Sequence, residues 1–137
     1  MTTIVATMKA IYADTLCSYC VPFKVNKIAR IGQSIFAGAG DMDDLQRFFT
    51  WRREGGDQPA FDEQIDILEL CTDGIFLWGK KMVRLPIGDE VYSVGSGSQY
   101  AMGALAMGAT PQQAIGIAAG LDPQTGKTIN VVKLKGR

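Results

Sequence analysis

Histidine is absent from this 137-residue sequence. Its absence excludes Ser-His-Asp and Cys-His nucleophilic triads, histidine general bases and every metal site that needs an imidazole ligand. Neither sign of charge is in excess, because 14 Lys and Arg residues balance 14 Asp and Glu residues. A nucleic-acid-binding protein of this size normally carries a basic excess or a basic stripe, so we expect no nucleic-acid partner. An enzyme with this composition needs a nucleophile that works without histidine.

Cysteine is scarce as well. The three cysteines, Cys17, Cys20 and Cys71, do not have the even number typical of a disulfide framework, and they cannot form a Cys₄ zinc site. Cys17 and Cys20 have the C-x-x-C spacing of a redox pair, but no βαβ pattern surrounds them. We therefore interpret them as two reduced cysteines in or beside a strand.

Long hydrophobic runs and signal-peptide patterns are also missing. We therefore expect a cytoplasmic protein that has no membrane partner. A phosphate-binding loop ending at Gly126-Lys127-Thr128 would need Gly where Leu121 stands, and the strand-to-helix context is reversed. Gly95-Ser96-Gly97 lacks the third glycine of a dinucleotide-binding turn. The sequence thus predicts no cofactor, and we expect no metal.

The length predicts one domain over residues 1–137, since a domain has ~100–200 residues. Hydrophobic alternation and turn residues indicate strands, and a period of 3.6 with capping residues indicates helices. Strands are predicted at Thr2–Met8, Ala10–Ala13, Lys24–Ile31, Ser34–Ala37, Ile65–Leu70, Gly74–Trp78, Met82–Leu85, Val91–Val94 and Thr128–Leu134. Helices are predicted from the N-cap Asp41 to about Arg52, from Ser98 to Met107, and from the Thr110 capping box to Gly120. This block order predicts an α+β fold with two antiparallel sheets face to face and helices outside.

The N-terminus offers a nucleophile that needs no imidazole. Removal of Met1 would leave Thr2 with a free α-amine beside its own hydroxyl. An unperturbed α-amine has a pKa of roughly 7.7–8.0, so it can act as a base near neutral pH. Nucleophile and base would then lie on one residue.

Several ordered blocks resemble the proteasome β-subunit family, and within it the HslV peptidases, which are N-terminal nucleophile (Ntn) hydrolases. The blocks that carry the resemblance are Thr2-Thr3-Ile4-Val5, Tyr12-Ala13-Asp14, Asn26-Lys27-Ile28, Phe36-Ala37-Gly38-Ala39-Gly40-Asp41, Val94-Gly95-Ser96-Gly97-Ser98, and Ala118 to Asp122 followed by Thr125-Gly126. The resemblance implies a four-layer αββα sandwich. Arg53–Gln64 is too short for the family's second long helix, so one helical layer is predicted to be reduced.

The resemblance also implies a catalytic set. Its members are Thr2 as nucleophile, Lys27 to lower the pKa of the Thr2 hydroxyl, Asp14 to orient Lys27, the Gly38 amide as oxyanion donor, and Ser96, Asp122 and Thr125 around the Thr2 amine. Thr125 stands where the family usually has Ser, which keeps the hydroxyl. Each of three positions also has a purely structural alternative: a solvated strand lysine for Lys27, a helix cap for Ser96 and a turn residue for Asp122.

The function expected from this set is threonine peptidase activity on polypeptides, by way of an acyl-enzyme. The alternatives are a catalytically silent assembly protein that keeps Met1, and transfer of the acyl group to an amine instead of water. The resemblance further implies a homo-oligomer of stacked rings and an ATP-dependent unfoldase as partner. The first helix adds an argument, because Phe48, Phe49 and Trp51 cannot all face one sheet. We expect Trp51 to be exposed at a partner surface, unless it folds under the Arg53–Gln64 loop.

Overall fold

Two antiparallel sheets lie face to face in the computed structural model, which describes residues 2–18, 21–61, 64–79 and 81–135. The four-stranded sheet, in the order β10-β1-β2-β11, consists of β1 (Ile4–Thr7), β2 (Ala10–Asp14), β10 (Val91–Val94) and β11 (Ile129–Lys133). The five-stranded sheet, paired in chain order, consists of β5 (Ile28–Ile31), β6 (Ser34–Gly40), β7 (Ile65–Cys71), β8 (Gly74–Trp78) and β9 (Arg84–Ile87). Alternate residues of the strands point into the space between the sheets, where Ile4, Ile11 and Leu68 are fully buried.

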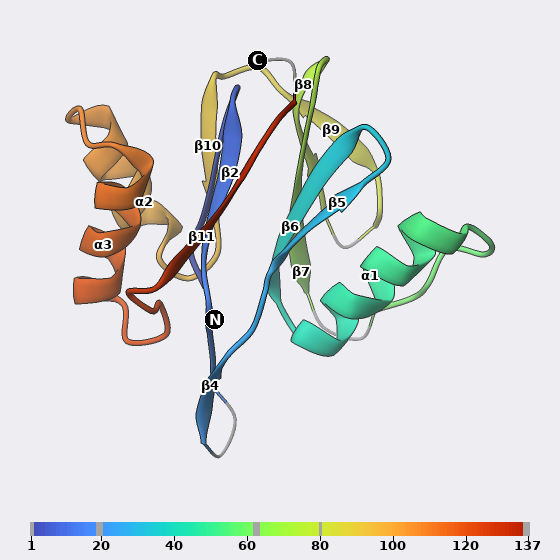
Figure 1. Cartoon of the computed structure of the whole chain (residues 1–137), viewed down its shortest axis with the longest axis horizontal. Helices are drawn as coiled ribbons and strands as arrows, with labels where there is room; N and C mark the ends of the chain where they lie inside the picture. The colour runs from blue at the N-terminus through green and yellow to red at the C-terminus, as the bar shows by residue number, and fades with distance from the viewer. Residues whose placement is uncertain (1, 19–20, 62–63, 80, 136–137) are drawn as a thin grey trace.

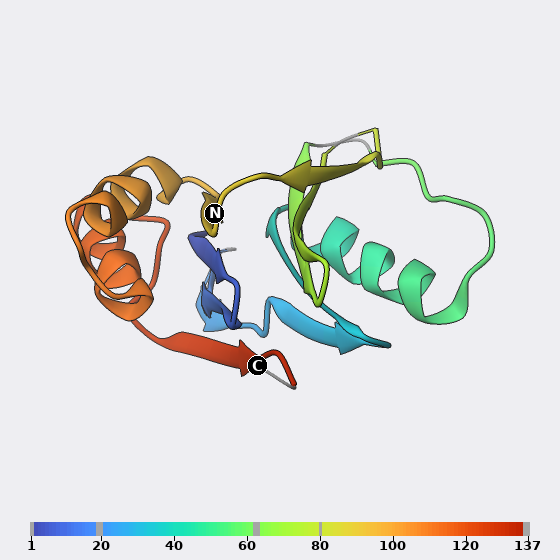
Figure 2. The same ribbon diagram turned by 90° about the horizontal axis from the view of Figure 1, so that it is seen from above.

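Helices cover the outer face of each sheet, as Figures 1 and 2 show from two directions. Helix α1 (Met42–Glu54) packs on the five-stranded sheet, and α2 (Ser98–Ala106) and α3 (Pro111–Leu121) pack on the four-stranded sheet. The predicted αββα arrangement is therefore confirmed. Among the described residues, α1 is the only helix of its layer, which confirms the expected reduction. No helix in this part of the chain is long and apolar enough to span a membrane.

The helix ends follow the predicted capping residues. The Asp41 carboxylate accepts a hydrogen bond from the Asp43 amide at the start of α1. Thr110 and Gln113 form a reciprocal capping box at the start of α3. Such caps satisfy amides that have no partner inside a helix, so helix starts can be predicted well from sequence.

One predicted strand was wrong in extent. Lys24–Ile31 is broken into β4 (Pro22–Lys24) and β5, because the intervening residues carry the chain from a small hairpin into the five-stranded sheet. In that hairpin β4 pairs with β3 (Leu16–Ser18), and Figure 1 shows it extending beyond the layers. Buried Cys17 lies in β3 as expected, whereas Cys20 lies outside the described residues. Smaller shifts move the end of β6 to Gly40 and the start of β9 to Arg84.

The expectation that Trp51 is exposed was wrong. Trp51 is half-buried, it makes edge-to-face contacts with Phe48 and Trp78, and its indole N–H donates to the Gly56 carbonyl at 3.3 Å. Phe61, also in the segment that follows α1, is buried in the same cluster. The chain after α1 thus folds back over the helix, which was the alternative that the sequence left open.

Candidate functional site

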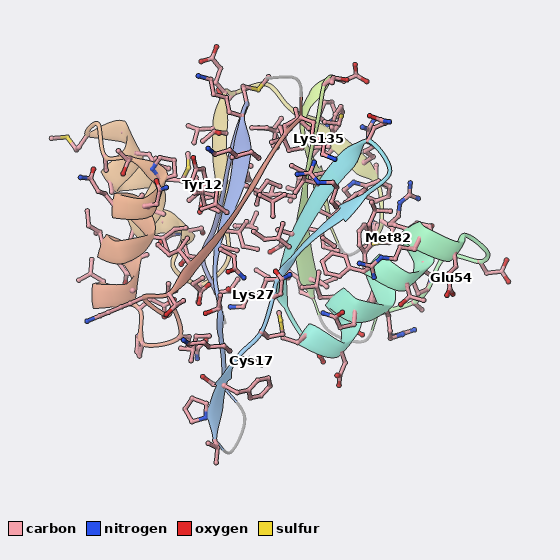
Figure 3. The ribbon with its side chains drawn as sticks, in the orientation of Figure 1. Tyr12, Cys17, Lys27, Glu54, Met82 and Lys135 are labelled. Carbon is pink, nitrogen blue, oxygen red and sulfur yellow. The ribbon has the colours of Figure 1, made fainter. Side chains whose placement is uncertain are left out.

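The hydroxyl of Thr2 lies against a buried ion pair. Lys27 Nζ donates to Thr2 Oγ1 and, at 3.2 Å, to Asp14 Oδ1, and Thr2 Oγ1 donates to the same carboxylate. All three side chains are fully buried. Figure 3 shows Lys27 at one end of the space between the sheets, near the N-terminus marked in Figure 1. A charged amine and a carboxylate are therefore aimed at one hydroxyl.

Backbone geometry explains why these residues meet. Asp14 ends β2, and its amide donates to the Thr3 carbonyl at 3.3 Å, so the start of β1 is held beside it. The Asp14 carboxylate also accepts from the Thr3 amide at 2.9 Å and from the Gly126 amide at 2.8 Å. Lys27 directly precedes β5, at the point where the chain enters the opposite sheet. The break in the predicted strand is thus what places Lys27 across from Thr2.

Burial lowers the pKa of Lys27, and the charge of Asp14 and its hydrogen bond oppose that shift. Removing an ammonium from water disfavours its charged form, while a nearby carboxylate favours it. The proton of Lys27 is consequently held less tightly than in water. The hydrogen bond of Lys27 to Thr2 Oγ1 polarises that hydroxyl.

A second polar cluster lies on the backbone nitrogen of Thr2. The Thr2 N–H donates to Ser96 Oγ at 3.2 Å, and Ser96 Oγ donates to Asp122 Oδ2 at 2.6 Å. Thr125 Oγ1 donates to the same Asp122 oxygen at 2.7 Å. Burial raises the pKa of Asp122, but the hydrogen bonds from Ser96, Thr125 and the Gln124 amide outweigh it and lower the pKa overall. Asp122 is therefore kept ionised and holds Ser96 in place.

Gly38 lies in β6, and its N–H donates to the Lys27 carbonyl at 3.3 Å. A Cβ atom at Gly38 would be 2.4 Å from Leu45 Cδ1, so packing against α1 by itself requires glycine here. Gly38 thus has a packing reason to be glycine, apart from the oxyanion role expected for its amide. The Gly38 N–H can donate to an oxyanion only when it gives up its hydrogen bond to the Lys27 carbonyl.

The structure brings together six of the seven residues predicted for the site, with Gly38 attached through the Lys27 backbone. Sequence reasoning missed Thr3, whose hydroxyl is 2.7 Å from that of Thr125. It also missed why Gly95 and Gly97 are glycines. A Cβ atom would lie 2.1 Å from the Thr2 carbonyl oxygen at Gly95 and 2.0 Å from Thr3 Oγ1 at Gly97. The Gly-Ser-Gly pattern was a signal for this close approach.

No group of three or more Cys, Asp or Glu side chains that could hold a metal occurs in the described part of the chain. The chemistry that the site offers is that of a hydroxyl between a lysine–aspartate pair and a backbone nitrogen. Such a hydroxyl is polarised for nucleophilic attack.

Comparisons with known proteins agree with the fold. The structure is similar to that of Thiobacillus denitrificans BPH, with a TM-score of 0.71 and 22% identity over 99% of both chains. The structure of that protein in complex with epoxomicin gives a TM-score of 0.71 and 20% identity over 98% of both chains. Eukaryotic HslV from Trypanosoma brucei gives a TM-score of 0.70 and 16% identity, over 96% of this chain and 98% of that one. The sequence matches no protein-family model and no curated protein. The full-length likeness establishes a fold of the HslV kind.

Proposed function

We propose that the chain is a threonine peptidase subunit of the proteasome and HslV kind, in which Thr2 hydrolyses amide bonds of polypeptides. The observation that carries the proposal is the convergence of Lys27 and Asp14 on the hydroxyl of Thr2. Thr2 is the residue that loss of Met1 would leave at the N-terminus. A peptide inhibitor, epoxomicin, bound to a protein of this fold supports polypeptide as the substrate class.

The proposed reaction needs loss of Met1, because the Thr2 nitrogen is otherwise part of a peptide bond. The freed amine, held by Ser96, takes the proton of the Thr2 hydroxyl while Oγ1 attacks the substrate carbonyl carbon. The Gly38 amide turns from the Lys27 carbonyl to the developing oxyanion. The protonated amine then gives its proton to the leaving nitrogen, and an ester on Thr2 remains. Water then attacks the ester while the Thr2 amine takes its proton, and the amine returns that proton to Oγ1 as the acid product leaves.

The silent-protein alternative also has support. Thr2 has no exposed surface in the chain that carries Met1, and the Gly38 amide already has an acceptor. The two proposals differ in the mass of the purified protein. A peptidase requires the intact mass to lack one methionine, whereas the silent protein retains it.

The decisive assay is turnover of fluorogenic peptides. We expect Thr2→Ala to abolish turnover, because it removes the nucleophilic oxygen. Thr2→Ser keeps that oxygen and should retain part of the turnover. Both variants should show the thermal unfolding of the wild type. Equal turnover by the wild type and Thr2→Ala would refute the proposal.

We further propose that the chain forms a homo-oligomer through its α2–α3 face. No Asp, Glu, Lys or Arg occurs between Glu90 and Asp122, so both helices are uncharged. A groove of about 550 Å³ lies along them, beside four exposed apolar side chains: Tyr100, Met107, Ile117 and Leu121. A two-fold contact brings the same surface of both copies together, so a face without charge avoids like-charge repulsion.

Light scattering at micromolar concentration tests the oligomer. We expect a mass that is a multiple of 14.8 kDa and a lower mass for Met107→Glu, which places like charges in the contact. Lys9→Glu, an exposed change on the β1–β2 turn, is the matched control. A wild-type mass near that of one chain would exclude this oligomer.

A further inference from the structure

A cleft of about 420 Å³ opens beside the candidate site. Ser96 and Ser98 border it on one side, and residues of the five-stranded sheet, among them Asp66 and Leu77, border it on the other. Tyr92 of β10, in the four-stranded sheet, also lines the cleft. The cleft therefore runs from the residue that holds the Thr2 nitrogen to a carboxylate on the opposite sheet.

Among the described residues that line the cleft, Asp66 is the only charged one. Its strand neighbours Ile65 and Ile67 pack toward α1, so strand alternation turns Asp66 to the face that looks toward the other sheet. It is half-buried, and its carboxylate accepts a hydrogen bond from the uncharged side-chain amide of Gln64 at 3.5 Å. No ion pair joins it to another of the described residues.

The position of Asp66 ties it to the reacting groups. It is the cross-strand partner of Ala39, which directly follows Gly38. Facing side chains on neighbouring antiparallel strands are within about 5.5 Å at Cβ. A carboxylate thus stands one residue along the strand pair from Gly38, whose amide would donate to the oxyanion.

The direction of the cleft indicates which half of a substrate it holds. In the proposed function the Thr2 amine protonates the leaving nitrogen, and the Thr2 nitrogen lies 3.2 Å from Ser96 Oγ. The leaving half must therefore pass over Ser96, which lines the cleft. The acyl half extends from Thr2 on the other side, away from Ser96 and this cleft.

We propose that this cleft binds the side chain that follows the cleaved bond and that Asp66 selects lysine or arginine there. The inference rests on the proposed function and deepens it. A long basic side chain would lay its apolar stem along Leu77 and Tyr92 and bring its charge to Asp66. Acidic side chains would be repelled by the same carboxylate.

The test uses quenched peptides that differ only in the residue after the cleaved bond, which is Lys, Ala or Glu, with mass spectrometry to fix the cleavage position. We expect kcat/KM to be about fivefold higher for Lys than for Ala, as for a half-exposed ion pair of about 1 kcal/mol. Asp66→Asn should bring this ratio to one, Asp66→Glu should keep it, and Asp66→Lys should favour Glu. Asp73→Asn, on the exposed β7–β8 turn, is the matched control. An unchanged ratio in a folded Asp66→Asn protein would overturn the inference.

Failure of the proposed function gives a different result, namely no cleavage of any of the three peptides. Binding of lysine amide to the full-length protein then tests the cleft by itself. Amide NMR shifts at Tyr92 and Asp66 that vanish in Asp66→Asn support the cation site, and their absence in the wild type refutes it.

Discussion

Asp14 and Glu69 are both buried carboxylates with a cationic partner, and they differ in what their networks enclose. Glu69 accepts from Arg84 at 2.8 Å, from Trp78 at 3.0 Å and from Ser34 at 2.6 Å. These donors lie in β9, β8 and β6, which belong to the same five-stranded sheet as β7. Asp14 instead joins the chain start, the entry to the second sheet and the loop before β11.

The difference between these networks separates a structural ion pair from a candidate catalytic one. The Arg84 side chain is 40% exposed, so its charge remains solvated, and every partner of Glu69 satisfies the carboxylate itself. Lys27 and Asp14 are fully buried and share a third partner, the Thr2 hydroxyl. Replacing a buried pair by apolar residues is often neutral or stabilising, so stability alone does not account for this one. The chemistry proposed at Thr2 would account for its geometry.

The largest expected effect is on turnover. We expect Lys27→Ala and Lys27→Arg to lower kcat/KM by about 100-fold or more, the usual range for a group that assists proton transfer. Arg keeps the charge but not the compact ammonium that fits between Thr2 and Asp14. Arg84→Met, the matched change in the other network, should leave kcat/KM unchanged. Peptide turnover under identical conditions measures both, and wild-type activity in Lys27→Arg would remove Lys27 from the mechanism.

A smaller effect is expected on the free energy of unfolding. It arises where the backbone passes close to the Thr2 network, a close approach that the Glu69 network does not require. Gly97→Ala would place a Cβ atom 2.0 Å from Thr3 Oγ1 and 2.9 Å from Thr125 Oγ1. We expect it to destabilise the protein by about 1–3 kcal/mol in urea unfolding. Gly103→Ala in α2, where a Cβ atom meets nothing within 4 Å, should instead stabilise by up to about 1 kcal/mol. Equal effects of the two changes would mean that the Gly95–Gly97 turn is not tightly packed.

The elements of this fold could be predicted where local chemistry determines them. Asp41, the Thr110 capping box and the Asp73-Gly74 turn are local signals, and α1, α3 and the β7–β8 hairpin follow them. The break before Lys27 could not be predicted, because it depends on which sheet the next strand joins. The inward position of Trp51 depends likewise on a loop that returns over α1.

The candidate site divides in the same way. Thr2, Asp14 and Lys27 were predicted because their blocks resemble a family, and periodicity alone would leave Lys27 as a solvated strand residue. Asp66 carries no motif, and its place opposite Ala39 depends on cross-strand register, which a single sequence does not specify. Thr3 lies in the first block of the resemblance, but its contact with Thr125 depends on the tertiary fold.

The two networks should also respond to pH in different ranges, Glu69 at acidic pH and Lys27 at alkaline pH. Burial raises the pKa of Glu69, but hydrogen bonds from Arg84, Ser34 and Trp78 outweigh it and lower the pKa overall. A lowered folded pKa gives stability above the unfolded value of about 4.3 that is lost as the pH falls through the folded pKa. Glu69→Gln should therefore cost about 1 kcal/mol at pH 7 and progressively less below pH 4. Urea unfolding at pH 7, 5 and 3 measures this difference, and a constant difference would contradict the pairing.

Lys27 should give the smallest effect, with a slope of the same sign in a more alkaline range. Its pKa is lowered chiefly by burial, so between the folded pKa and the unfolded value of about 10.4 the unfolded chain binds more protons. Stability contributed by Lys27 then rises with pH over that range. We expect the stability of the wild type relative to Lys27→Met to increase from pH 7 to pH 9 in urea unfolding. The same comparison with Arg84→Met should stay flat, because Glu69 raises the pKa of Arg84 above its ordinary value. A wild-type advantage over Lys27→Met that shrinks as the pH rises would mean that Asp14, and not burial, dominates the lysine, and that Lys27 is held as a permanent cation.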